Sequence, residues 1–205
     1  MLSIHNFNDT QTIASSISSN SFDNNSSLTN LSSLDKNDTF NYSNVPELKD
    51  VYFRPKEILY FKSIDSYYKN LSLKYVQQMI DIIEGNSILS LRLLDWFVTK
   101  YSKKYNIKYN IDSNNFDFDN KFVVHISYKA QLRAYKKEHF DPFRRRKKFF
   151  YTFKQNNVKI PTTIGQLHFF KWAFDNNIID YVISNHEKIK LNNIINYHYP
   201  RVFIV

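Results

Sequence analysis

Cationic side chains are concentrated in one segment of this sequence, between Lys121 and Lys154. The segment holds eleven lysines and arginines against two carboxylates, and five of the cations follow one another from Arg144 to Lys148. Phosphates attract such a segment, because each phosphate that a lysine or arginine neutralises releases condensed counterions. Arginine also presents a planar fork that matches phosphate oxygens. These residue types therefore favour the binding of a polyanion, and nucleic acid is the first candidate.

The spacing of the cations predicts one basic surface. On a helix from about Tyr128 to His139, at about 100° per residue, the first four cations share a face beside an apolar face that docks on the core. A turn at Asp141-Pro142 then returns the arginine-rich run to the same surface, and Phe150 in the following strand either stacks on a base or packs. We expect the residues that contact nucleic acid to be Lys129, Arg133, Lys136, Lys137, Arg144, Arg145, Arg146, Lys147, Lys148 and Phe150. The charge alone does not distinguish DNA from RNA.

The same charge has other interpretations. A run such as Arg144–Lys148 also occurs on solvated basic faces and in import-like clusters, and it could meet an acidic protein partner in an assembly. The many Asn, Lys, Ile, Tyr and Phe residues are typical of an AT-rich genome, so part of the lysine excess follows from codon usage.

The sequence lacks the residues that many catalytic and cofactor-binding sites require. The chain has only two glycines, Gly85 and Gly165, so a glycine-rich phosphate loop is not expected. It has no cysteine, which excludes disulfides, thiolate zinc sites, iron–sulfur clusters and thiol nucleophiles. We expect no cofactor, no metal and no catalytic residues.

The remaining candidates for chemistry are scattered. The histidines show no metal-binding spacing, and we expect His125 in a strand and His168 on a buried helix to be hydrogen-bonded core residues. Asp117 and Asp119, in a polar loop over residues 112–120, would be the carboxylates of a metal-dependent enzyme. A plain solvent loop is the more ordinary interpretation of that segment.

The elements around the basic segment predict an α+β fold, with a helical hairpin, a small antiparallel sheet and C-terminal helices. Apolar spacing and turn residues predict a helix that ends at Gly85 and a second helix from Ser87 or Ser90 to Tyr105. Thr163 is the expected N-cap of a later helix. The other expected elements are strands at Ile107–Ile111, Lys121–Ser127 and Lys148–Phe153, and short helices at Ile178–Ser184 and Glu187–Tyr197.

The predicted organisation is a disordered tail over residues 1–48 and one domain over residues 49–205. The tail is rich in Ser and Asn and cannot bury enough apolar surface to offset its ordering entropy. Two lysines against six carboxylates leave residues 1–50 at −4, whereas the whole chain carries +9. No apolar run approaches the roughly 18 residues that span a bilayer, so we expect no membrane partner.

Three blocks of the sequence resemble a known family. They are Ser127–Leu132, then Phe140–Phe143 followed by Arg144 and Arg145, then Thr163–Ala173. Together they are similar to an uncharacterised protein family of nucleocytoplasmic large DNA viruses, the giant viruses, over about residues 90–185. The resemblance implies a virus factory in the host cytoplasm, or the virion, as the setting. It also implies DNA or other viral proteins as partners, and it assigns no catalytic residues.

Overall fold

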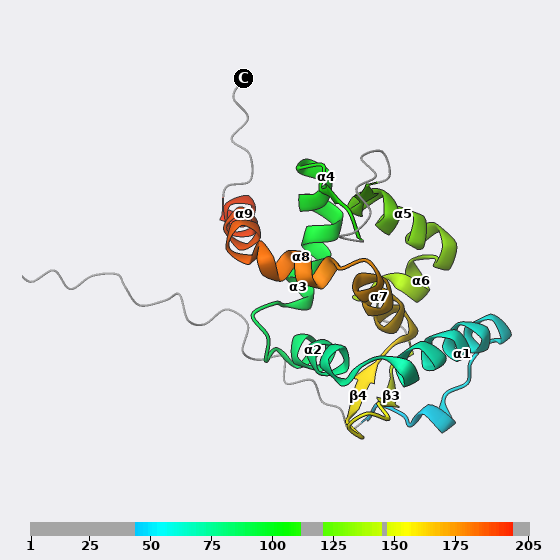
Figure 1. Ribbon diagram of the computed structural model, residues 1–205. Coiled ribbons are helices and arrows are strands. Elements are labelled where there is room, and N and C mark those ends of the chain that lie inside the picture. The colour runs from blue at the N-terminus through cyan, green and yellow to red at the C-terminus, as the bar shows by residue number, and fades with distance from the viewer. Residues whose placement is uncertain (1–43, 112–120, 145–146, 199–205) are drawn as a thin grey trace, which may run out of the picture. The chain divides into compact units, whose positions relative to one another are not determined.

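The computed structural model describes residues 44–111, 121–144 and 147–198 (Figure 1). The predicted tail up to residue 43 lies outside the described residues. So do the loop with Asp117 and Asp119, and the two arginines Arg145 and Arg146.

The described chain is mainly helical with small antiparallel sheets, which confirms the α+β class. Its strands pair as β1 (Lys108–Tyr109) with β2 (Phe122–Val123), and as β3 (Phe149–Thr152) with β4 (Lys159–Thr162). Its helical segments are η2 (Leu48–Asp50, 3-10), α1 (Pro55–Asn70), α2 (Leu73–Glu84), α3 (Leu91–Trp96), η3 (Phe97–Tyr101, π-helical), α4 (Ser102–Lys104), α5 (Val124–Tyr135), α6 (Lys137–Phe140), α7 (Ile164–Asp175), α8 (Ile178–Ser184) and α9 (His186–His198).

Helix α7 lies in the middle of an aromatic core. Most of its side chains are buried, including Phe169, Phe170 and Trp172. The helices α6 and α1 pack against it (Figure 1). The approach of α6 is close at Gly165, where a Cβ atom would lie 2.9 Å from the carbonyl oxygen of Asp141. The core therefore fixes the N-terminal half of the domain and the basic segment relative to each other.

Local signals placed several element ends correctly. Helix α2 ends at Gly85, whose φ of 80° is in the left-handed region that glycine favours. Ser90 accepts a hydrogen bond from the N–H of Leu93, and Thr163 accepts one from the N–H of Gln166, so both act as N-caps. In β3 and just after it, the alternate side chains that were expected in the core are buried, namely Phe149, Tyr151 and Phe153.

Other expectations differ from the structure. The strand predicted over Lys121–Ser127 is limited to β2, because α5 already begins at Val124. The strand β4 was not expected. The helix predicted to end at Tyr105 does form, but with the π-helical segment η3 inside it. Helix α3 follows α2 in the chain, and its main close backbone contacts are with η3 and α9.

Candidate nucleic-acid interface

The helix predicted over residues 128–139 is in fact two helices. Helix α5 ends at Tyr135, and Lys136 has φ 62° and ψ 157° before α6 begins at Lys137. The break turns α6 onto α7, which buries His139 and Phe140. The single stripe of four cations is therefore wrong. Lys129 and Arg133 remain one turn apart on α5, whereas Lys136 and Lys137 lie at and beyond the break.

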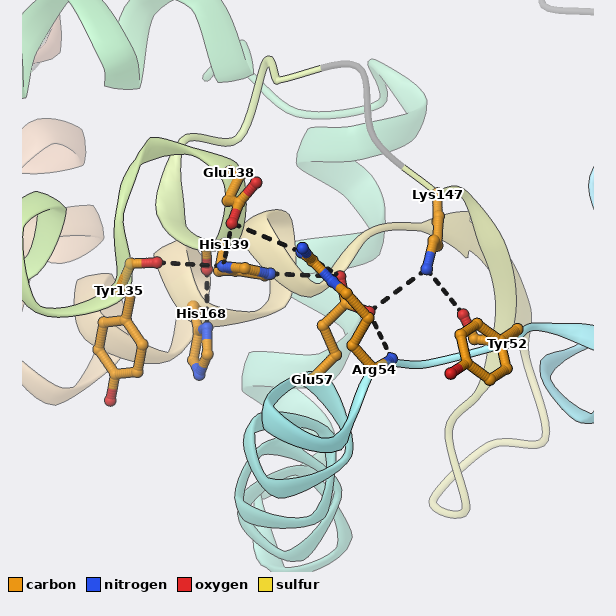
Figure 2. Close-up of polar contacts among 8 residues, drawn as sticks. All are labelled: Tyr52, Arg54, Glu57, Tyr135, Glu138, His139, Lys147 and His168. Carbon is orange, nitrogen blue, oxygen red and sulfur yellow. Dashed lines mark hydrogen bonds and ion pairs between the residues drawn. The ribbon is translucent and has the colours of Figure 1, made fainter.

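Beside this break, five side chains from three segments meet in what we call the Glu57 cluster: Arg54, Glu57, Glu138, His139 and Lys147. Figure 2 shows them pointing toward one another around the first turn of α1. The carboxylate of Glu57 accepts hydrogen bonds from the Arg54 backbone N–H at 2.8 Å and from Arg54 Nη2 at 3.0 Å. Lys147 Nζ donates to it at 3.3 Å, and His139 Nε2 lies 3.4 Å from it.

The Glu57 carboxylate is ionised at neutral pH. Glu57 is only 7% exposed, and burial by itself would raise its pKa. Hydrogen bonds from Arg54, His139 and Lys147 outweigh that effect and hold the pKa of Glu57 at about 2. The cluster thus stabilises a buried negative charge, which ties the start of α1 to α6 and to the segment before β3.

The two histidines near this site serve the fold. His139 Nδ1 lies 3.1 Å from the carbonyl oxygen of Tyr135, so each ring nitrogen of His139 faces an oxygen atom of the fold. Beneath it, His168 Nδ1 donates to the carbonyl oxygen of His139 at 2.8 Å (Figure 2). Burial lowers the pKa of His168 to about 4 and keeps it neutral. His168 is the hydrogen-bonded core residue that was expected.

His125 differs from its prediction. It lies in the first turn of α5 and not in a strand, and it is half-buried. Its Nδ1 atom is buried and has no hydrogen-bond partner among the described residues.

Two hollows border the Glu57 cluster. The first, of about 270 Å³, extends from the cluster to two apolar side chains, Phe53 and Ile164. The second, of about 360 Å³, extends from the cluster to Pro55, Lys56 and Lys136. The hollows share Arg54, Glu57, Glu138 and His139, so Lys136 and Lys147 lie at the same cluster although they are eleven positions apart in the sequence.

The structure places the predicted residues in different settings. Five are exposed and form no ion pair with another described residue: Lys129, Arg133, Lys136, Lys137 and Arg144. Lys147 is bound to Glu57 but keeps 46% of its side chain exposed. Lys148 is half-buried.

Phe150 is engaged within the fold. Its N–H donates to the carbonyl oxygen of Pro46 at 3.0 Å, and Glu47 pairs with it in a parallel bridge. Lys159 Nζ lies 4.5 Å from its ring centroid. Packing, one of the two roles considered for Phe150, accounts for these contacts.

Sequence reasoning missed helix α1 and with it Arg54, Lys56 and Glu57. Few apolar residues recur at regular spacing in this helix, and Ile58 and Leu59 are exposed. A proline at the first helical position and a glutamate three residues after the N-cap are nevertheless a helix-start signal that could have found it. The meeting of Glu57 with His139 has no such local signal.

The described residues can be compared with the requirements of a metal site and of a membrane-spanning helix. Among them, no group of three or more histidine, aspartate or glutamate side chains is arranged to hold a metal ion. None of their helices is both long and apolar enough to cross a membrane.

Comparison with known proteins places the chain in a family. A family model described as "Family of unknown function (DUF7197)" matches residues 41–196. An uncharacterized protein of Acanthamoeba polyphaga mimivirus is 42% identical over 155 residues, which cover 71% of this chain and 59% of that relative. The chain thus spans less than two thirds of the length of this relative. No solved structure matches the chain. The resemblance to a giant-virus family is confirmed, and the chain belongs to the DUF7197 family, whose function is unknown.

Proposed function

We propose that the protein binds nucleic acid, with DNA as the first candidate, through the exposed cations of the α5–α6 region and of the turn after α6. The observation that carries this proposal is the second hollow, which Lys136 lines together with Arg54 and Lys56. Lys136 is some eighty residues from the other two in the sequence, and the fold brings the three side chains to one hollow. Arg54 and Lys56 extend the basic surface beyond the segment in which the sequence concentrates its charge.

The carboxylates nearby leave much of this positive charge available. Glu57 and Glu138 pair with Arg54, and Glu57 also pairs with Lys147. The five exposed cations named above have no such partner among the described residues. An exposed cation without an intramolecular partner gives up no ion pair when it meets a phosphate, and it still gains the counterion release.

The backbone of Lys136 gives separate support. Its φ of 62° with ψ of 157° belongs to a region used almost only by glycine, and such a conformation costs about 1–3 kcal/mol for other residues. A lysine occupies the position although glycine would fit it better. A binding role for the Lys136 ammonium group at the rim of the hollow would explain why that cost is tolerated.

The family context sets where such binding would act. Because a relative belongs to a giant virus, we propose that the protein acts on DNA in the cytoplasmic virus factory or in the virion. Packaging, late gene expression and assembly are the processes that this setting offers.

The test is a fluorescence anisotropy titration of the full chain against labelled 30-nucleotide DNA, single-stranded and duplex, between 50 and 200 mM salt. If the five cations contact phosphates, affinity for a single strand should fall roughly 100-fold over that range. Charge reversal by K129E/R133E should weaken binding at least tenfold. Binding that is absent, or that does not weaken with salt, would contradict the proposal.

A matched control separates local contacts from overall charge. The variant K188E/K190E changes the net charge by the same amount, and both lysines are exposed on α9, which lies apart from α1, α5 and α6 (Figure 1). This variant should retain most of the affinity. Equal loss in both variants would show that net charge alone attracts DNA. An acidic protein partner would instead be indicated if K129E/R133E bound DNA normally but lost binding to poly-glutamate.

A further inference from the structure

Two exposed aromatic side chains border the cations of the proposed interface. Tyr52 is 77% exposed and Phe143 is 47% exposed. Lys147 Nζ donates to the carbonyl oxygen of Tyr52 at 2.8 Å and lies 5.5 Å from the centroid of its ring. Figure 2 shows this lysine between the Tyr52 ring and the Glu57 carboxylate. Tyr52 is therefore attached to the Glu57 cluster while its ring remains largely open to solvent.

Phe143 is held in a comparable way. The Asp141 side chain accepts a hydrogen bond from the Phe143 N–H at 2.9 Å, and the Asp141 carbonyl oxygen accepts one from the Arg144 N–H at 3.2 Å. Pro142 is buried, so the turn is anchored while the Phe143 ring points outward. Phe143 and Lys147 are four positions apart in the sequence, so their Cα atoms are at most about 15 Å apart.

An exposed aromatic ring beside a cation is the combination that single-stranded nucleic acids use. Bases stack on the ring, and the adjacent phosphates contact the cations. In a duplex, both faces of each base are covered by neighbouring base pairs, so Tyr52 and Phe143 would gain little from it. The aromatic residues thus favour a single strand over a duplex, whereas the cations alone would bind either.

The first hollow adds an apolar wall next to the Glu57 cluster. Its lining combines the charged Arg54, Glu57, Glu138 and Lys147 with the apolar Phe53 and Ile164. An unstacked base, which has flat apolar faces and polar edges, suits such a mixed lining.

We infer that this surface prefers single-stranded nucleic acid, with bases stacked on Tyr52 and Phe143 and phosphates on the neighbouring cations. The preference presupposes the proposed nucleic-acid binding and specifies its substrate class.

The test compares wild type with Y52L/F143L, which keeps apolar bulk but removes both rings. Affinities for a 30-nucleotide single strand and for the duplex of the same length are measured at one salt concentration. Wild type should bind the single strand at least tenfold more tightly than the duplex. The variant should lose about tenfold or more on the single strand, with duplex binding and the salt slope nearly unchanged.

The outcomes separate the two proposals. Equal affinity of wild type for both DNAs, or an unchanged affinity of Y52L/F143L for the single strand, would overturn the inference and leave salt-dependent binding intact. Absence of salt-dependent binding to either DNA would overturn the proposed function itself. Because both rings are exposed, the variant should unfold at nearly the wild-type temperature, and thermal unfolding verifies that a lost affinity is not lost folding.

Discussion

The Glu57 cluster makes the most direct prediction about stability. In the variant E57Q the side chain keeps its size but loses its charge. Donors from Arg54, His139 and Lys147 converge on the carboxylate at 2.8 to 3.4 Å. A glutamine offers them one carbonyl oxygen and turns its own NH2 group toward the others. The variant therefore removes acceptors from donors that are partly shielded from water.

The size of the effect follows from the pKa of Glu57. A pKa lowered from 4.5 to about 2 corresponds to at most about 3 kcal/mol of stabilisation. Arg54 and Lys147 are about half exposed, so solvent screens their charges. We expect E57Q to lower the free energy of unfolding by about 1–2 kcal/mol at pH 7.

The effect has a defined pH window. Because folding lowers the pKa of this carboxyl group, its stabilisation is complete above about pH 4.5 and is lost as the pH falls toward 2. Urea unfolding followed by circular dichroism between pH 7 and pH 2 should show wild type and E57Q converging at the acid end. The control is E47Q, since Glu47 pairs with Lys159 on the surface and is 46% exposed. It should cost less than about 0.5 kcal/mol. A stability of E57Q equal to wild type at pH 7, or a difference that persists unchanged to pH 2, would refute the reasoning.

Three further variants test the surroundings of the site. Because burial lowers the pKa of His168 from 6.5 to about 4, its neutral form stabilises the fold above pH 6.5, and about 3 kcal/mol should be lost as the pH falls to 4. Urea unfolding of H168N should lack this loss. The variant G165A places a Cβ atom 2.9 Å from a backbone oxygen and should cost about 2 kcal/mol. The control G85A has open space but a φ of 80°, and it should cost about 1 kcal/mol in the same thermal unfolding series. The variant K136G should gain about 1 kcal/mol of stability by relieving the backbone while DNA binding weakens, whereas K136A should weaken binding without that gain. Unchanged DNA binding by K136G would remove Lys136 from the interface.

Signals within a few residues of one another predicted much of the local structure. Gly85, Ser90 and Thr163 marked helix ends through backbone conformation and capping, both of which depend on neighbouring residues only. The alternation of Phe149, Tyr151 and Phe153 predicted the buried face of β3, because successive side chains in a strand point to opposite faces.

The break in the basic helix could not be predicted in this way. Lys136 and Lys137 are good helix formers, so local propensity favours a helix that continues through them. The chain turns at Lys136 because His139 and Phe140 must be buried against α7, which is a tertiary requirement. The packing of α6 thus overrides local propensity and divides the expected stripe of cations.

Only part of the candidate site could be predicted, because the rest depends on tertiary packing. The exposure of cations such as Lys129 and Arg133 follows from their charge and their place on α5. Their relation to Arg54, Lys56 and Glu57 depends on α1, whose position against α7 is set by packing between residues about a hundred positions apart. An example is Tyr68, whose hydroxyl donates to the carbonyl oxygen of Leu167 at 2.8 Å.

The central claim is that cations of the α5–α6 region contact phosphates, and the salt dependence of DNA affinity tests it most directly. The slope of log affinity against log salt on single-stranded DNA should be about −3.5 for wild type if five cations take part. Neutralising three of them in K129A/R133A/K136A should reduce the slope to about −1.4. A slope that stays at the wild-type value in this variant would contradict the claim, because the three side chains would then contact no phosphate.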